Sequence, residues 1–150
     1  MQTRIRRLVP PFPDERVLMA LCLPALDVVT PDVLDALLAA LADTGAAPRV
    51  DDVQIVVAEA LNNIVEHAYS DQAFGAVSVK LVLTDSDLRI DLVDWGAPFP
   101  NHAMPEGPAP APEALSEGGY GWFLIRTLAS TTAYGRLANA NRLSLGFRLR

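Results

Sequence analysis

The chain has 150 residues, 51% of them hydrophobic and 20% charged, which suits one globular domain with a core of ordinary size. Its net charge is −6 and its only lysine is Lys80, so it lacks the clustered basic side chains that hold a nucleic-acid backbone. The longest apolar stretches fall short of the roughly 18 residues needed to cross a bilayer, so we expect a soluble, cytoplasmic protein.

The N-terminal region, residues 1–14, is broken by prolines and is expected to be a tail outside the domain at 15–150. Its arginines at positions 4, 6 and 7 are typical of a solvated tail, and we assign them no role. The lone cysteine, Cys22, lies in an apolar run and cannot form an internal disulfide, which favours a reducing compartment and predicts a buried, inert thiol.

The first half of the domain begins with a predicted strand over residues 16–23, ended by Pro24. A helix follows, with Thr30 as the predicted N-cap and Pro31 at the first helical position, and Gly45 closes it. Apolar residues at helical spacing support this helix: Val33, Leu34, Leu37, Leu38 and Leu41.

The remaining predicted elements are two helices, each followed by a β-hairpin. A second helix is predicted over 51–69, and two hairpins are predicted, from strands 76–83 with 88–93 and from strands 131–137 with 142–149. A third helix is predicted over 119–130. Between the hairpins, residues 98–112 contain six of the chain's twelve prolines and are predicted to be a long loop of the kind that forms lids or binding loops.

About five strands and three helices, with consecutive strands in hairpins, predict an α/β (α+β) two-layer sandwich. The helices would cover one face of a mixed, mostly antiparallel sheet.

The second helix carries an unusual polar face. Its members are Glu59, Asn62, Asn63, Glu66 and His67. Asparagine and histidine are weaker helix formers than the residues of an ordinary solvated face, so something besides helicity favours them. Glu59 and Asn63, four residues apart, could offer a proton acceptor and an oxygen ligand for Mg²⁺ at one place. A hydrated helix face explains the same residues, and we expect His67 to be a structural hydrogen-bonding residue.

Two glycine segments follow. Asp94 ends an alternating strand just before Gly96, where its carboxylate could accept a hydrogen bond from an exocyclic amino group such as that of adenine. Ordinary turn chemistry gives the same pattern.

The second segment, Gly118-Gly119-Tyr120-Gly121, stands directly before a helix, where unpaired backbone amides form an anion site. A hinge is the alternative interpretation, and both can hold together. A lysine-containing P-loop is absent from the sequence.

In this order and spacing, the segments resemble the GHKL ATPase superfamily, and within it the RsbW-like anti-sigma factor serine/threonine kinases. The resemblance covers roughly residues 15–150. Residues 58–69 look like the N box, 94–98 like the G1 box, 117–126 like the G2 box, and 141–145 like the closing strand motif.

The resemblance implies a Bergerat-type fold that binds ATP and Mg²⁺ under a lid at about 99–118. It implies that Glu59 is the general base and that Asn63 is the magnesium ligand. The residues implied to contact the nucleotide, besides Asn63, are Asp94, Gly96, Gly119, Gly121 and Ser144.

The resemblance also implies a homodimer, a sigma factor as partner, and a STAS-domain anti-anti-sigma factor as protein substrate. The alternative is a nucleotide-binding partner-switching module without catalysis. Trp122 stands where the family usually has leucine, Trp95 fills a position that is often polar, and the lid is unusually rich in proline, so catalytic rate is harder to predict than ATP binding.

Overall fold

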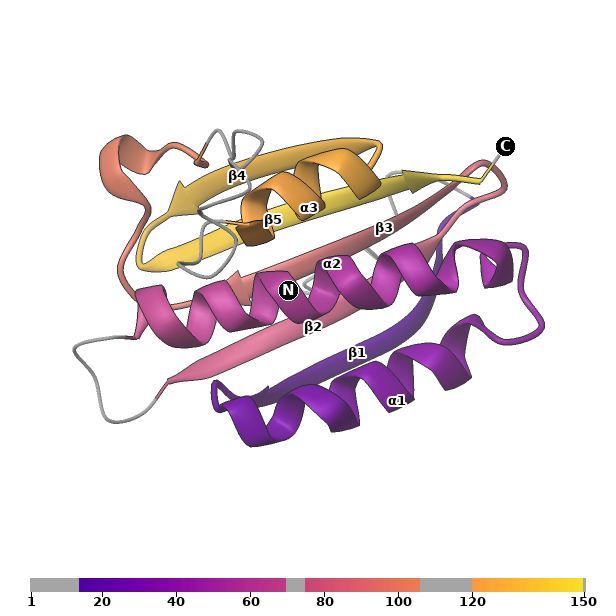
Figure 1. Cartoon of the computed structure of the whole chain (residues 1–150), viewed down its shortest axis with the longest axis horizontal. Helices are drawn as coiled ribbons and strands as arrows, with labels where there is room; N and C mark the ends of the chain where they lie inside the picture. Colours follow the sequence, from indigo (N-terminus) through magenta and orange to yellow (C-terminus); the bar gives the residue numbers. More distant parts are fainter. Residues whose placement is uncertain (1–13, 70–74, 106–119, 150) are drawn as a thin grey trace, which may run out of the picture.

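The computed structural model describes residues 14–69, 75–105 and 120–149, and nearly all of the predicted tail and most of the predicted lid lie outside these ranges. Five strands form one sheet in the order β1-β2-β3-β5-β4 (Figure 1). Their bounds are β1 Arg16–Pro24, β2 Ala76–Leu83, β3 Asp87–Asp94, β4 Thr131–Leu137 and β5 Ala140–Arg148.

Three helices, α1 (Thr30–Leu41), α2 (Val50–Asn63) and α3 (Tyr120–Leu128), cover one face of this sheet, so the two-layer sandwich is confirmed (Figure 1). All four strand pairings are antiparallel. The parallel pairing that a mixed sheet would contain is therefore not found among the strands the structure describes. The reason is topological, because both hairpins pair internally and then join through an antiparallel β3–β5 contact.

The core lies between the helices and the sheet. Strand alternation turns every second side chain of β3 and β5 toward the helices, and these side chains are buried: Leu88, Ile90, Leu92, Leu143, Leu145 and Phe147. Helix α2 contributes the facing layer: Val53, Val56, Val57, Ala60 and Leu61. This layer holds α2 across the sheet and fixes where its polar end lies.

Helix α2 does not end as a regular α-helix. Residues Ile64–Ala68 continue it as a π-helix, which is a wider turn with hydrogen bonds from residue i to residue i+5. Such turns are often found at functional sites, and this one falls within the predicted N box.

Two local predictions are wrong. Thr30 is not the N-cap, because it already has helical backbone angles, Val29 occupies the cap, and no side-chain cap hydrogen bond forms. Cys22 is exposed, because the alternation of β1 turns it away from the helices, with Ser78 as its partner on β2. An apolar run in an edge strand thus buries one face only.

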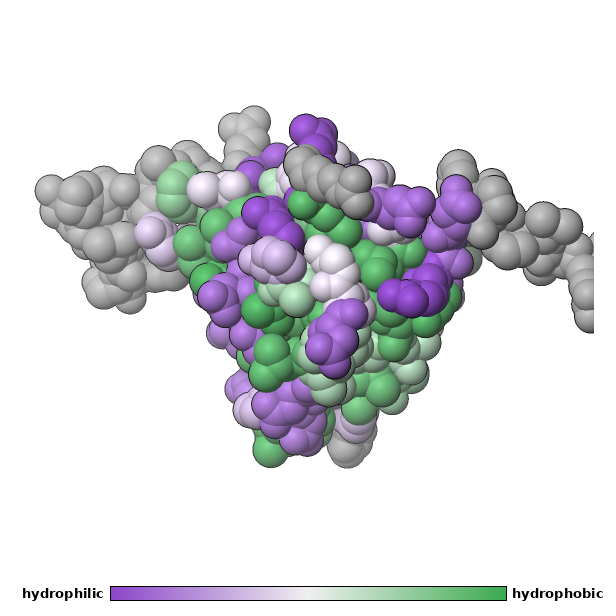
Figure 2. Space-filling model, turned by 90° about the vertical axis from the view of Figure 1, so that its right-hand side faces the viewer, coloured by the Kyte–Doolittle hydropathy of each residue, from purple (hydrophilic) through white to green (hydrophobic). Residues whose placement is uncertain are grey.

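No helix in the described part of the chain is both long and apolar enough to span a membrane. Figure 2 views the molecule from the end that carries the β2–β3 hairpin, and hydrophilic residues are interspersed there with hydrophobic ones. Strand β3 ends with Asp94 at the opposite end of the sheet.

Candidate functional site

A cavity of about 500 Å³ opens where the end of α2, the loop after β3 and helix α3 meet strands β4 and β5. Its walls combine apolar and polar side chains, with Asn63, His67, Asp94 and Asn141 among the polar ones. A concave, largely apolar site with a few polar groups is typical of a small-molecule binding site. The structure therefore brings Asn63 and Asp94, from two predicted motifs, to the same cavity.

Asp94 is 6% exposed at the end of β3. Its Oδ1 accepts hydrogen bonds from the Gly96 amide (2.9 Å) and from Nδ2 of Asn141 (2.8 Å). Burial raises the pKa of Asp94, while the hydrogen bonds from Asn141 and Gly96 and the charge of Arg136 partly offset that rise. Oδ2 accepts no hydrogen bond from the described residues, which leaves one acceptor for a ligand donor.

Asn141 is the residue of this site that the sequence reasoning missed. It pairs with Asp94 across β3 and β5, is 3% exposed, and donates to the carbonyl oxygens of Gly96 (3.2 Å) and Ala97 (3.1 Å) as well as to Asp94. Its own Oδ1 accepts from Tyr134 (2.9 Å) and Arg136 (2.6 Å). The closing strand motif begins at Asn141, but the motif alone gives this residue no role, because only the strand register places it opposite Asp94.

Gly96 has a packing role at this site. A side-chain carbon there would overlap the carbonyl oxygen of Ala68, which also accepts the Ala97 amide at 2.8 Å. Tyr69 adds a second link, since its hydroxyl accepts the Trp95 amide at 2.8 Å. Ala97 and Pro98 are among the described residues that line the cavity and Gly96 is not, so a contact of Gly96 with the nucleotide stays a prediction.

Asn63 lines the cavity with an unsatisfied amide. Its Nδ2 is buried and has no hydrogen-bond partner among the described residues. Buried polar atoms are rarely left without a partner, so an orphan here fits a polar ligand in the cavity. The amide can present its oxygen to a hard cation or its nitrogen to a phosphate oxygen, and both orientations suit Mg²⁺ with a nucleotide.

No cluster of three or more histidine, cysteine or acidic side chains that could hold a metal is present in the described ranges. A magnesium ion held by one side chain together with substrate phosphates needs no such cluster. The residues at the cavity therefore fit the predicted ion only in company with a phosphate-bearing ligand.

Glu59 lies one helical turn before Asn63, and its carboxylate packs against α3. A side-chain carbon built on Gly121 would lie 2.6 Å from Oε2 of Glu59. Glu59 is not among the described residues that line the cavity. The structure thus brings Glu59 and Gly121 together, beside the cavity rather than inside it.

Three aromatic rings form part of the cavity wall. Phe99 packs edge-on against Trp122 with 5.2 Å between ring centroids, and it packs against Tyr134 at 4.6 Å. The Phe99 amide donates to the Tyr134 hydroxyl at 3.2 Å. Trp122, which replaces the usual leucine of the G2 box, therefore packs against the ring of Phe99 in the cavity wall.

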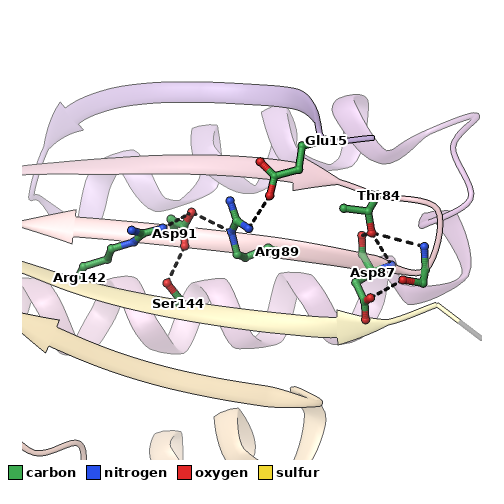
Figure 3. A network of polar contacts seen from close by, with 8 residues as sticks. Glu15, Thr84, Asp87, Arg89, Asp91, Arg142 and Ser144 are labelled. Carbon is green, nitrogen blue, oxygen red and sulfur yellow. Dashed lines mark hydrogen bonds and ion pairs between the residues drawn. The ribbon is translucent and has the colours of Figure 1, made fainter. Parts of the chain in front are cut away.

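Ser144 does not line the cavity. It pairs with Asp91 across β3 and β5, and its hydroxyl donates to Oδ1 of Asp91 at 2.6 Å. Figure 3 shows this pair with Arg89, Arg142 and Glu15 on the face of the sheet opposite the helices. The predicted place of Ser144 near the base is wrong, because strand alternation turns residues 141 and 143 to the cavity and 144 to the other face.

His67 lines the cavity beside Asn63 and lies 3.8 Å from a carboxylate oxygen of Glu66. Gly119 and the predicted lid from residue 106 lie outside the described residues. The described start of the loop is held by α3, because Arg126 donates two hydrogen bonds to the carbonyl oxygen of Pro105, at 2.8 and 2.7 Å.

Comparison with known proteins agrees with this geometry. The chain is 39% identical over 84 residues to the serine-protein kinase RsbW of Bacillus licheniformis, in an alignment that covers 53% of this chain and 52% of that protein. It is 33% identical over 85 residues to the serine-protein kinase RsbW of Bacillus subtilis, covering 53% of each chain. The aligned part therefore spans about half the length of these curated relatives.

The family profile described as histidine kinase-like ATPase domain matches residues 23–147, which include every motif that forms the cavity. The resemblance stated from the motifs is thus confirmed at the level of the family. This chain belongs to the histidine kinase-like ATPase domain family.

Proposed function

We propose that the protein is a serine/threonine-protein kinase that binds ATP with Mg²⁺ in the 500 Å³ cavity. The observation that carries this proposal is the convergence of Asp94 and the orphaned amide of Asn63 on that cavity. Asp94 would accept the amino group of adenine, and Asn63 would hold the ion against the phosphates. Bound Mg²⁺ neutralises charge that develops on the transferred phosphoryl group.

In the transfer step, the hydroxyl oxygen of the substrate serine or threonine attacks the γ-phosphorus of ATP. The bond from the γ-phosphorus to the β–γ bridging oxygen breaks, ADP leaves, and the carboxylate of Glu59 accepts the hydroxyl proton. Its position one turn from Asn63 supports this role, since both side chains project from the same side of α2.

The biological role we propose is that of an anti-sigma factor. The protein would sequester a sigma factor, phosphorylate a STAS-domain anti-anti-sigma factor, and act as a homodimer in the cytoplasm. The support is the sequence similarity to proteins named serine-protein kinase RsbW together with the three ordered motifs.

A transfer assay with labelled ATP and a candidate STAS-domain substrate tests the kinase. Wild type should label the substrate, Glu59→Gln should bind ATP but lose labelling, and Asn63→Ala should lose both. Glu66→Gln is the matched control, because Glu66 lies on the same segment with its side chain 61% exposed. Equal labelling by wild type and Glu59→Gln would show that the base is misassigned.

A second function is favoured by one observation: Glu59 packs against Gly121 and is not among the described lining residues. A protein that sequesters and releases partners on nucleotide binding needs no base at the cavity. Partner exchange at saturating ATP without a labelled product would identify this non-catalytic switch.

A further inference from the structure

We propose that Asn141, held by Tyr134 and Arg136, is a positioning residue that makes Asp94 select an amino-bearing purine over a carbonyl-bearing one. The inference rests on the proposed nucleotide site and assigns its base selectivity to residues on β4 and β5 that act through Asp94. These three residues form a clamp on Asp94.

The clamp fixes one oxygen of the Asp94 carboxylate. Nδ2 of Asn141 donates to Oδ1 at 2.8 Å, and the Gly96 amide donates to the same atom at 2.9 Å. The two oxygens of an ionised carboxylate are equivalent, and the two donors on Oδ1 fix the orientation of the group, so one oxygen faces these donors and the other does not. Oδ2 is therefore the oxygen available to a ligand.

Asn141 acts through Asp94 and has no capacity left for a ligand. Its amide nitrogen serves Asp94, Gly96 and Ala97, and its Oδ1 accepts the Tyr134 hydroxyl and Nη1 of Arg136. These two donors oblige the amide oxygen to face β4, so the amide nitrogen must face Asp94. An inverted Asn141 would place its oxygen against the carboxylate.

Arg136 also links the clamp to the loop that follows β3. The same Nη1 that donates to Asn141 donates to the carbonyl oxygen of Gly96 at 3.0 Å. Its charge favours the ionised form of Asp94 against the effect of burial. An ionised carboxylate only accepts hydrogen bonds, so Oδ2 attracts an amino group and repels a ring carbonyl.

The test compares binding of ATP with binding of inosine triphosphate, which carries a carbonyl in place of the adenine amino group. Wild type should prefer ATP by about 10- to 100-fold, the range for one hydrogen bond to a buried charged group. In Arg136→Met, Tyr134→Phe and Asn141→Leu this preference should fall about tenfold, mainly through weaker ATP binding. Thermal melting reports whether each variant is folded.

The control is Arg142→Met, because Arg142 follows Asn141 on β5 and turns to the other face, where it pairs with Asp91 at 3.0 Å. It should keep the wild-type preference. A purely structural role for the clamp would weaken both nucleotides equally, and unchanged ratios in the folded variants would overturn the inference. If wild type binds neither nucleotide, the proposed function itself fails, so the two failures are distinguishable.

Discussion

The carboxylate of Glu59 on α2 occupies the space that a side chain at Gly121 on α3 would fill, since a β-carbon placed at position 121 would lie 2.6 Å from Oε2 of Glu59. A glycine of the predicted phosphate motif therefore also makes room for the proposed base. The two motifs are coupled by packing, and this coupling can be tested separately from nucleotide binding.

Gly121→Ala should displace Glu59 and reduce phosphoryl transfer about 100-fold or more, the usual contribution of a general base. ATP affinity should change much less, because alanine keeps the backbone amide by which position 121 is predicted to meet phosphate. Steady-state transfer rates and ATP titration measure the two effects. Gly135→Ala is the matched control, since nothing lies within 4 Å of a carbon built there. Wild-type transfer by Gly121→Ala would contradict the coupling.

Gly96→Ala should destabilise the fold by about 1–3 kcal/mol, as overpacking does in a rigid environment. The new carbon would overlap the backbone carbonyl of Ala68, which cannot move away as a flexible side chain could. Urea unfolding measures the change in the free energy of unfolding. Gly45→Ala, with nothing within 4 Å, serves as the comparison and should cost far less. Equal effects of the two substitutions would show that the Ala68 contact is not tight.

Asp94→Asn should keep or raise stability at neutral pH while weakening ATP binding. Burial raises the pKa of Asp94 above 3.8, so the folded state binds its proton more tightly than the unfolded state. The contribution of Asp94 to stability therefore falls as pH rises from 3.8 through the folded-state pKa. Asparagine does not titrate, so the stability of the variant should not fall with pH at this position. Unfolding measured at several pH values checks the sign. A variant less stable than wild type at neutral pH would contradict it.

Asp91→Asn should behave in the opposite way. Burial raises the pKa of Asp91, but the hydrogen bonds from Ser144 and Arg142 and the charges of Arg142 and Arg89 outweigh it, so the pKa lies below 3.8 (Figure 3). Its stabilisation is present above pH 3.8 and is lost as pH falls through the folded-state pKa. The variant should lose about 1.5–3 kcal/mol at neutral pH. ATP affinity should stay unchanged, and a loss of affinity would place this sheet face in the binding site.

Trp122 offers a direct optical report on the cavity. It is 8% exposed in the wall, whereas the chain's other tryptophan, Trp95, is 46% exposed. In a Trp95→Phe variant, ATP should change the emission of the remaining tryptophan, because a bound base excludes water from its ring. The Trp122→Leu variant, with Trp95 retained, should show a smaller change. An unresponsive Trp122 at saturating ATP would place the base elsewhere.

Local sequence patterns determined most of the secondary structure. Strands 76–83 and 131–137 have the predicted bounds, and helix α3 lies within its predicted range. These elements were predictable because alternating and helical apolar spacing are local properties of the chain. The order of the motifs was likewise enough to identify the family that the comparisons then showed.

The tertiary structure decided which side chains meet. A shift of one residue in the β3–β5 register would exchange the two faces, so Asn141 beside Asp94 and Ser144 beside Asp91 follow from a pairing between distant segments. The exposure of Cys22 has the same origin, because local alternation does not reveal which face the helices cover. Motifs therefore identified the kind of site, and the strand register assigned its neighbours.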